Sequence, residues 1–390
     1  MTEWCQKLFI VYPKAIVRIA IVIVNNICCI PTYTLWMLLL LPLKRFNEKL
    51  YYKIEGKFFH WILSVVAMWS WSAGYDVVET GDDLTPCQEE GTRTLLLANH
   101  QSTADVPLFM ACFNAKPDVL PHLMWIMDRV FKFTNFGIVS VLHRDFFVQA
   151  GRKTRDATIE NLKHHLRDTF LPLERRWLVL FPEGGFLRKR LEVSQKYAAK
   201  NNLPILKNVT LPRIGALKAI MEIIPPRNSI GNNNAAKRIE NGNNTGRPFG
   251  SQEHIFQYQS KKDDDTDGPN LDYVLDVTVA YPDRIPLDLP TIVTGSRPPC
   301  KTHFLYRLYH SSEIPKEEQA LTQWLFDRWT EKEHLLEEFY RTGQFPHASA
   351  CQPTVVEQDL LRMLIINLFF MTSSYVHYKL FYVILNSFTL

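Results

Sequence analysis

Apolar residues are concentrated near both ends of the chain, in stretches long enough to meet a membrane. Residues 15–43 contain a run of 25 residues without a charge, and such a helix, at about 1.5 Å per residue, reaches across a hydrocarbon layer about 30 Å thick. A second apolar stretch, residues 58–76, carries three Trp residues and suits either a crossing or a helix at the membrane interface. Residues 360–390 turn apolar again. We therefore expect N-terminal and C-terminal membrane helices and a lipid bilayer as a partner, with a buried core helix as the alternative for residues 15–43.

Between these ends, residues 92–345 have the pattern of a globular domain. Short apolar runs that stop at polar residues predict buried strands at residues 94–98, 177–181 and 273–279. A run with more alternation predicts a strand nearer the edge of the sheet at residues 302–310.

Helices are expected between these strands. Apolar residues at helical spacing predict helices at residues 154–170 and 316–341. Strands interleaved with helices favour the α/β class, with a mostly buried sheet flanked by helices. Residues 225–270 break this pattern because they are rich in Asn and Gly and hold few side chains that can pack. We predict a disordered insertion there.

Composition narrows the possible functions. The chain has 44 Lys and Arg residues against 40 Asp and Glu residues, a net charge of +4, which excludes the dense basic face of a nucleic-acid-binding protein. Its seven Cys residues form no Cys-x-x-Cys pair, which argues against a disulfide framework and a zinc site. Reduced thiols and an excess of cations after residue 43 predict that the globular domain faces the cytosol.

The strongest candidate for chemistry is His100, which directly follows the strand predicted at residues 94–98. Imidazole is a good base near neutral pH, and a carboxylate on its other nitrogen fixes its tautomer. Asp105 lies five residues further on. In a regular helix that offset would place the two side chains about 140° apart, so they meet only if the chain turns between them. The alternative is an ordinary His in a loop.

A second candidate follows the strand predicted at residues 177–181. Glu183 is able to accept a hydrogen bond from a substrate hydroxyl, and Gly184 lets a substrate approach the backbone closely. Arg188 belongs to a run of three cations that suits a phosphate group. A plain turn and a solvated charged face are the alternatives.

Two further arginines follow short apolar runs. Arg144 ends the run at residues 137–143, and Arg213 follows Leu211 and Pro212. Arg binds phosphate oxygens in a bidentate manner, so both are candidates for holding a phosphate. A structural ion pair is the alternative for each.

Taken in this order, the four pieces resemble the motifs of the glycerophospholipid acyltransferase family. The resemblance rests on residues 99–105, 137–144, 181–184 and 211–213. Two positions depart from the family pattern, because Gly185 stands where many members have Thr or Ser, and His143 stands where many have an acidic residue.

The resemblance implies that a long-chain acyl group passes from acyl-CoA, as co-substrate, to a free hydroxyl of a lysophospholipid, with lysophosphatidylglycerol or lysophosphatidylethanolamine as acceptor. His100 would be the general base and Asp105 its partner, and the middle motifs would bind the glycerol phosphate end. The backbone N–H groups near the start of the helix expected after Asn99 are candidates for holding the oxyanion. No cofactor and no metal are expected, and the resemblance points to the endoplasmic reticulum membrane.

Other functions remain open on the sequence. Within the family, lysophosphatidic acid and a monoacylglycerol are the alternative acceptors. From another class, the alternative is a catalytically inactive membrane scaffold that binds lipid. A serine lipase is disfavoured because the sequence has no Gly-x-Ser-x-Gly elbow.

Overall fold

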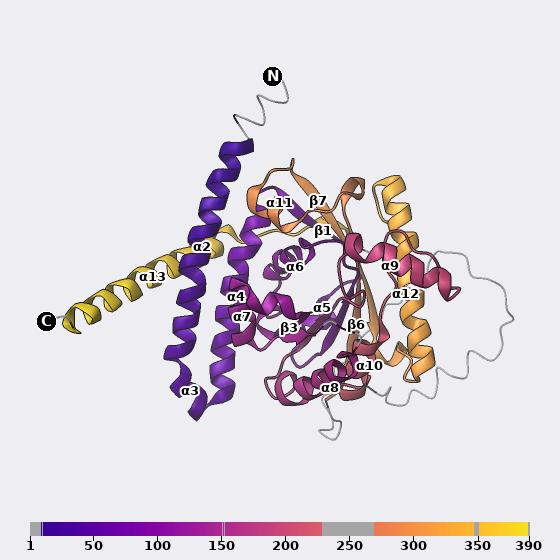
Figure 1. Ribbon diagram of the computed structural model, residues 1–390, viewed down its shortest axis with the longest axis horizontal. Coiled ribbons are helices and arrows are strands. Elements are labelled where there is room, and N and C mark those ends of the chain that lie inside the picture. Colours follow the sequence, from indigo (N-terminus) through magenta and orange to yellow (C-terminus); the bar gives the residue numbers. More distant parts are fainter. Residues whose placement is uncertain are drawn as a thin grey trace.

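An eight-stranded mixed sheet forms the centre of the protein. The computed structural model describes residues 9, 11–149, 151, 153–227, 269–346 and 351–388. The strands follow the spatial order β4-β3-β5-β2-β6-β7-β1-β8. Figure 1 shows helices on both sides of this sheet. The α/β class with a mostly buried sheet flanked by helices, expected from the sequence, is confirmed.

Most of the strands are short, and most of the connections between them contain helices. The strands are β1 (Tyr75–Gly81), β2 (Thr94–Ala98), β3 (Leu123–Asp128), β4 (Phe146–Val148), β5 (Trp177–Leu180), β6 (Tyr273–Ala280), β7 (Cys300–His310) and β8 (Cys351–Val355). The helices are α2 (Tyr12–Leu39), α3 (Leu41–Phe46), α4 (Glu48–Trp71), α5 (Thr85–Gln88), α6 (Asp105–Asn114), α7 (Asn135–His143), α8 (Arg155–His165), α9 (Leu187–Lys200), α10 (Ile214–Ile223), α11 (Leu289–Thr294), α12 (Glu318–Thr342) and α13 (Leu360–Phe388). Strands β2 to β6 run parallel to one another, and β7 is antiparallel to β6. The carboxyl ends of β2, β5 and β6 therefore meet at one edge of the sheet.

The central strands are buried on both faces, because neighbouring residues of a strand point to opposite sides. In β2, Leu96 and Ala98 join a core that also holds residues of α2, α4 and α6. Leu95 and Leu97 join a second core with residues of α8, α10 and α12. All four side chains are 0% exposed, which explains why this strand is a continuous apolar run.

The strand expected near the sheet edge lies inside the sheet, so that prediction is wrong. β7 pairs with β6 on one side and with β1 on the other. Its polar positions face α12 instead of solvent. Arg307 forms an ion pair of 2.9 Å with Glu331, and the His303 ring lies 4.9 Å from the ring of Phe339. The alternation of polar and apolar residues in β7 therefore reflects polar contacts with α12 and not exposure at an edge of the sheet.

The second apolar stretch, predicted at residues 58–76 as a membrane or interfacial segment, belongs mostly to a core helix. α4 lies between α2 and the sheet (Figure 1), and Phe59, Leu63 and Ala67 are at most 1% exposed. The end of the stretch, from Tyr75, starts β1. Because protein covers this apolar helix, its burial speaks against a membrane or interfacial segment there. The folded domain therefore starts before residue 92.

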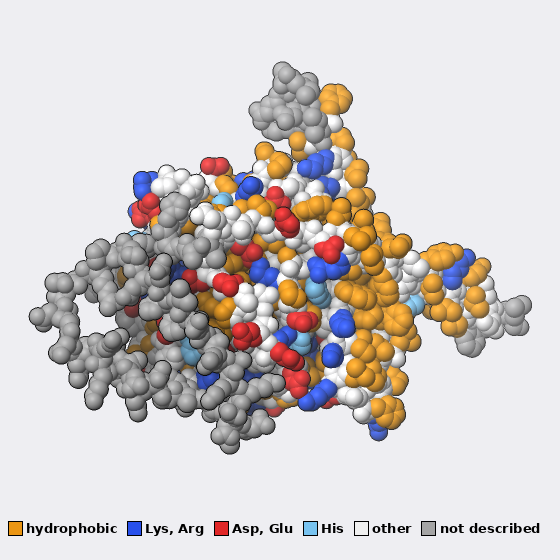
Figure 2. Space-filling view, turned by 180° about the vertical axis from the view of Figure 1, so that it is seen from behind, with side chains coloured by type: hydrophobic (Ala, Val, Ile, Leu, Met, Phe, Trp, Pro, Cys, Tyr) orange, Lys and Arg blue, Asp and Glu red, His pale blue; other side chains and the backbone are white. Residues whose placement is uncertain are grey.

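Among the described residues, α2 and α13 are the helices long and apolar enough to cross a membrane. Figure 2 shows hydrophobic side chains gathered over both helices. One side of α2 packs on the domain, where Tyr33 donates a hydrogen bond of 2.7 Å to Glu55, whereas Ile16, Ile23 and Ile27 on its other side are exposed. Every side chain of α13 in residues 378–387 is exposed.

The disordered insertion predicted at residues 225–270 lies mostly outside the described residues, which stop at Arg227 and resume at residue 269. The described residues at its two ends lie side by side. Pro226 forms a parallel bridge with Leu271, and the Arg227 amide donates to the Leu271 carbonyl at 3.1 Å. The chain therefore leaves the domain and re-enters it at one place.

A buried ion pair between α12 and β6 gives a first prediction. Lys332 lies 2.7 Å from Asp276, and the two residues are 0% and 4% exposed. Removing one partner of such a pair leaves a buried charge and destabilises a protein by about 3–5 kcal/mol. We expect Lys332→Met to lower the melting temperature in detergent strongly, and the double variant Asp276→Asn with Lys332→Met to recover much of the loss. Equal loss in the single and double variants would contradict this assignment.

Candidate active site

His100 is held where β2 ends, beside the end of β6. The Asn99 side chain donates to the Val279 carbonyl at 3.0 Å and accepts from the Val279 amide at 2.7 Å, so one amide group joins the two strand ends. The carbonyl of His100 accepts a hydrogen bond of 2.8 Å from the Leu187 amide at the start of α9. The backbone of His100 is thus fixed from two sides.

The chain turns after His100 and brings Asp105, the first residue of α6, back to its side chain. Asp105 Oδ2 lies 2.8 Å from His100 Nδ1. The same oxygen accepts from the amides of Gln101 at 2.7 Å and Ser102 at 3.0 Å, which closes the turn. Asp105 is 0% exposed. The turn that the spacing of the two residues requires is present, and it places the pair in contact.

Two aromatic rings hold the imidazole of His100. The Phe181 ring stacks on it at 4.2 Å, and the Phe186 ring meets it edge-on at 4.5 Å. Because the carboxylate of Asp105 accepts a hydrogen bond from Nδ1–H, this arrangement assigns the basic lone pair to Nε2. Among the described residues, no hydrogen bond to Nε2 is formed, and 12% of the side chain is exposed. His100 therefore has Nδ1 committed to Asp105, whereas Nε2 has no hydrogen-bond partner among the described residues.

Glu183 is a buried connector at this site. Its Oε1 accepts from the His100 amide at 3.1 Å and from Trp329 Nε1 at 3.3 Å, and its Oε2 accepts from the Thr210 amide at 3.1 Å and hydroxyl at 2.8 Å. Burial raises the pKa of Glu183 to about 7, although the hydrogen bonds from Thr210 and His100 oppose that rise. Both oxygens bind protein groups, so the contacts favour a positioning role over the predicted bond to a substrate hydroxyl.

Gly184 lies next to the guanidinium group of Arg213. Its φ is +69°, and a Cβ there would lie 3.2 Å from Cζ of Arg213, so a larger residue is excluded by backbone conformation and by space. The Arg213 amide also donates to the Pro182 carbonyl at 2.9 Å. Arg188 is exposed in the first turn of α9, next to Leu187. Gly184, Arg188 and Arg213 are therefore gathered around the turns that hold His100.

Arg144 lies at the other end of the parallel strands. Its neighbour His143 contacts the carbonyl of Leu123 at 2.8 Å, at the start of β3. Leu123 is level with Thr94, the first residue of β2, and the five residues of β2 separate its ends by about 16 Å. The Arg144 guanidinium lies 5.2 Å from the ring of Tyr52. This placement speaks against the predicted phosphate contact of Arg144 beside His100.

Two contacts at this site were not predicted from the sequence. Tyr281 donates a hydrogen bond of 2.6 Å to Asp105 Oδ1, and Trp329 on α12 donates to Glu183. The available signal for Tyr281 was its place directly after an apolar strand, as for His100. Within the described residues, no group of three or more His, Cys, Asp or Glu residues is arranged to hold a metal.

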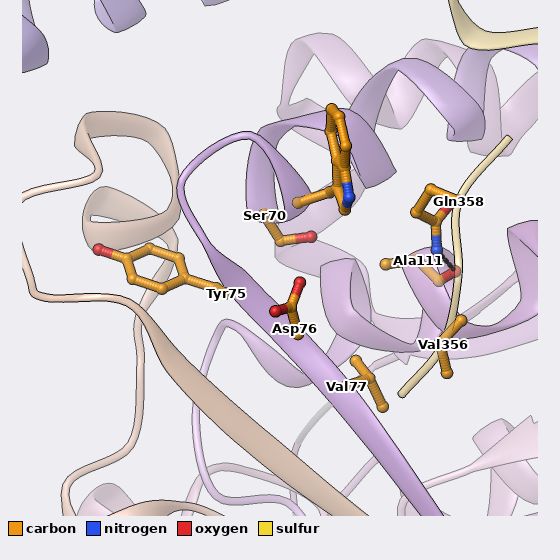
Figure 3. Close-up of a pocket in the computed structure, with 8 residues that line it drawn as sticks. Ser70, Tyr75, Asp76, Val77, Ala111, Val356 and Gln358 are labelled. Atoms are coloured by element: carbon orange, nitrogen blue, oxygen red, sulfur yellow. Dashed lines mark hydrogen bonds between the residues drawn. The ribbon is translucent and has the colours of Figure 1, made fainter. Parts of the chain in front are cut away.

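A small cavity lies between the end of α4, the start of β1 and the segment before α13 (Figure 3). It encloses about 200 Å³, including its open mouth, and Ser70, Asp76 and Gln358 line it. None of the predicted site residues is among its walls, so it contributes nothing to the site around His100.

Two family models match the chain. The model described as "Acyltransferase" matches residues 78–224, and the one described as "Acyltransferase C-terminus" matches residues 291–371. Human acyl-CoA:lysophosphatidylglycerol acyltransferase 1 is 40% identical over 370 residues, which cover 94% of this chain and 93% of the relative. This chain belongs to the acyltransferase family. The first matched range contains every residue predicted for the site, and Tyr281 lies outside both ranges.

More distant members of the acyltransferase family are also similar. The mouse protein of the same name is 39% identical, with the same coverage of 94% and 93%. A putative 1-acyl-sn-glycerol-3-phosphate acyltransferase of Caenorhabditis elegans is 26% identical over 90% of this chain and 81% of the relative. The crystal structure of a 1-acyl-sn-glycerophosphate acyltransferase from Thermotoga maritima covers 79% of this chain and 94% of that chain, at 14% identity and a TM-score of 0.37.

The raised pKa of Glu183 predicts a pH-dependent stability. The folded state holds this proton more tightly than the unfolded state, so the stabilisation is complete below about 4.5 and is lost as the pH rises through about 7. Glu183→Gln removes the titration. We expect the melting temperature of the wild type, relative to this variant, to fall by about 2 °C or more between pH 5 and pH 8. The exposed Glu337→Gln serves as control, and a difference that does not change with pH would contradict the raised pKa.

Proposed function

We propose that this protein transfers a long-chain fatty acyl group from acyl-CoA to a free hydroxyl of a lysophospholipid, with His100 as general base. The observation that carries the proposal is the contact of 2.8 Å between His100 Nδ1 and the buried Asp105 carboxylate, in a chain of the acyltransferase family. The relatives of 40% and 39% identity are named for lysophosphatidylglycerol, which supports that lysolipid as acceptor, and we propose lysophosphatidylethanolamine beside it.

The proposed reaction needs one base and no covalent enzyme intermediate. His100 Nε2 removes the proton from the acceptor hydroxyl as that oxygen attacks the carbonyl carbon of the thioester. A C–O bond forms, the C–S bond of acyl-CoA breaks, and the proton passes from the imidazolium to the departing thiolate. Asp105 orients the ring and stabilises the imidazolium. General-base help of this kind contributes about 10²–10⁴-fold.

The donors for the oxyanion do not come from the first amides of the turn. The amides of Gln101 and Ser102 donate to Asp105, and the amide of His100 donates to Glu183. These three amides are therefore committed to protein carboxylates, and the N–H groups near the start of α6 remain the predicted donors. The contacts of the three amides hold the base in position.

We also propose that the enzyme works at the surface of a membrane. Acyl-CoA and a lysolipid both carry long chains, and each CH₂ taken out of water contributes about 0.8 kcal/mol. The exposed apolar sides of α2 and α13 allow the enzyme to work at a bilayer, where the acyl chains need not enter water. We assign it to the endoplasmic reticulum membrane with the catalytic domain toward the cytosol, on the resemblance and the cation distribution.

His100→Ala tests the base directly. We expect a loss of about 10²–10⁴-fold in kcat/KM, measured as thiol release from acyl-CoA and as formation of diacyl phospholipid. His164, which is exposed on α8, provides the control His164→Ala with unchanged turnover. Wild-type turnover in purified His100→Ala would exclude the proposed role of the imidazole.

A comparison of Arg213 with Arg144 tests which of these arginines binds the phosphate group. Arg213 lies against Gly184, whereas Arg144 lies at the far end of the strands. We expect Arg213→Ala to raise the KM for the lysolipid about tenfold, as for a lost charged hydrogen bond, and Arg144→Ala to leave it within about twofold. A larger effect at Arg144 would return the phosphate site to that residue.

A head-group panel tests the acceptor. Lysophosphatidylglycerol and lysophosphatidylethanolamine should be acylated faster than lysophosphatidic acid or monoacylglycerol, and 1-acyl and 2-acyl isomers should be compared in parallel. A preference for the uncharged monoacylglycerol would contradict phosphate recognition, and no transfer with any acceptor would favour the inactive scaffold.

A further inference from the structure

Tyr281 contacts the catalytic carboxylate on the side away from His100. Its hydroxyl donates to Asp105 Oδ1 at 2.6 Å, while Oδ2 of the same carboxylate contacts His100 Nδ1 at 2.8 Å. Tyr281 and Asp105 are each 0% exposed. The phenol, the carboxylate and the imidazole therefore form one chain of hydrogen bonds that ends at Nδ1 of His100.

The backbone fixes the position of the phenol. β6 pairs with β2 in parallel, and the Asn99 amide group holds the β6 residue Val279 from both sides. Tyr281 follows β6 by one residue, so it leaves the sheet beside His100. After Pro282, Asp283 and Arg284 have φ values of +57° and +58°, a conformation that non-glycine residues rarely adopt.

Strain of this kind persists when the surroundings enforce it, and it is concentrated at functional sites. The Arg284 guanidinium lies 5.0 Å from the ring of Tyr340 on α12, which holds the turn against the domain. The turn therefore returns the chain sharply after Tyr281 and keeps the phenol pointed at Asp105.

We propose that Tyr281 is a positioning residue that fixes the Asp105 carboxylate and thereby sets the orientation and base strength of His100. The proposal rests on the proposed acyl transfer for its kinetic test. Tyr281 lies outside both matched family ranges, and its contact with Asp105 joins residues 176 positions apart in the sequence.

The physical basis is competition for one negative charge. Asp105 accepts from His100, Gln101, Ser102 and Tyr281, and each donor withdraws part of the charge that stabilises the imidazolium. Burial, followed by the nearby Asp105 charge, raises the pKa of Tyr281 well above its usual value, so the phenol donates throughout the working pH range. Without this donor, the carboxylate stabilises the imidazolium more strongly and holds its orientation less firmly.

The other ionisable groups around the pair come from several elements. They are Glu183 after β5, Tyr340 and Glu333 on α12, and the cations Lys189, Arg190 and Arg213 near the two glycines. Only Tyr281 and the backbone of the turn bind Asp105 besides His100 within the described residues. A change confined to the Tyr281 hydroxyl therefore tests Asp105 without altering those groups.

The experiment compares Tyr281→Phe with Tyr306→Phe in the full-length protein. Tyr306 is a matched control, because it is 3% exposed, lies on the neighbouring strand opposite Val277, and donates its own buried hydrogen bond of 2.6 Å to Glu79. In Tyr281→Phe we expect the acidic limb of the pH profile of kcat to move up by about 0.5–1 unit and the plateau to fall about tenfold, with both KM values within about twofold. Tyr306→Phe should lower stability alone.

A second replacement makes the opposite change. 3,5-Difluorotyrosine at position 281 keeps the hydroxyl and makes it a stronger donor, so the acidic limb should move to lower pH. If both replacements leave the limb where the wild type has it, or if Tyr306→Phe shifts it equally, the proposal is overturned and Tyr281 is only a stabilising contact.

The experiments distinguish a failure of the proposed function from a failure of this inference. If the wild type transfers no acyl group to any lysolipid, the proposed function is wrong. The His100 titration, followed by NMR of ¹³Cε1-labelled histidine and assigned with His100→Ala, then still reports the coupling. The same upward shift of its midpoint in Tyr281→Phe is expected, and an unchanged midpoint overturns the inference.

Discussion

The site depends on one buried carboxylate that accepts more hydrogen bonds than a single partner requires. Asp105 receives the imidazole, two backbone amides and a phenol, and it is the first residue of α6. A buried charge is tolerated only when it is fully hydrogen-bonded, so the turn after β2, the end of β6 and the start of α6 must all be in register before the charge is stable. The contacts that stabilise the buried Asp105 in the folded state are therefore the same contacts that orient the imidazole of His100.

A second buried carboxylate gives the site its outer frame. Glu183 joins the backbone of His100 to Thr210, before Arg213, and to Trp329 on α12. The elements that carry the arginines and the glycines are thus tied to the same backbone as the base. Distances between the base and any phosphate contact at Arg213 are set by buried groups and not by exposed side chains.

The sequence was informative where local pattern determines the structure. Strands β2, β5 and β6 are buried on both faces, so they appear as apolar runs, and His100 and Asp105 lie close enough in sequence for one turn to join them. It was not informative where distant segments decide. The sequence of an apolar helix is similar whether lipid or protein covers it. The pattern therefore predicts a membrane or interfacial segment at residues 58–76, where α4 packs inside the protein. The end of the sheet at which Arg144 lies depends on α7 and β3, and the contact of Tyr281 crosses 176 residues, which no local pattern records.

The bridge between Pro226 and Leu271 has a consequence for how this chain tolerates change. Pro226 and Leu271 bring together the two described ends of the chain at this place, and doubling the length of a flexible connection between two such ends changes the free energy of loop closure by only about 0.6 kcal/mol. An affinity tag or reporter domain inserted between Arg227 and residue 269 is therefore compatible with the sheet and with the contacts around His100.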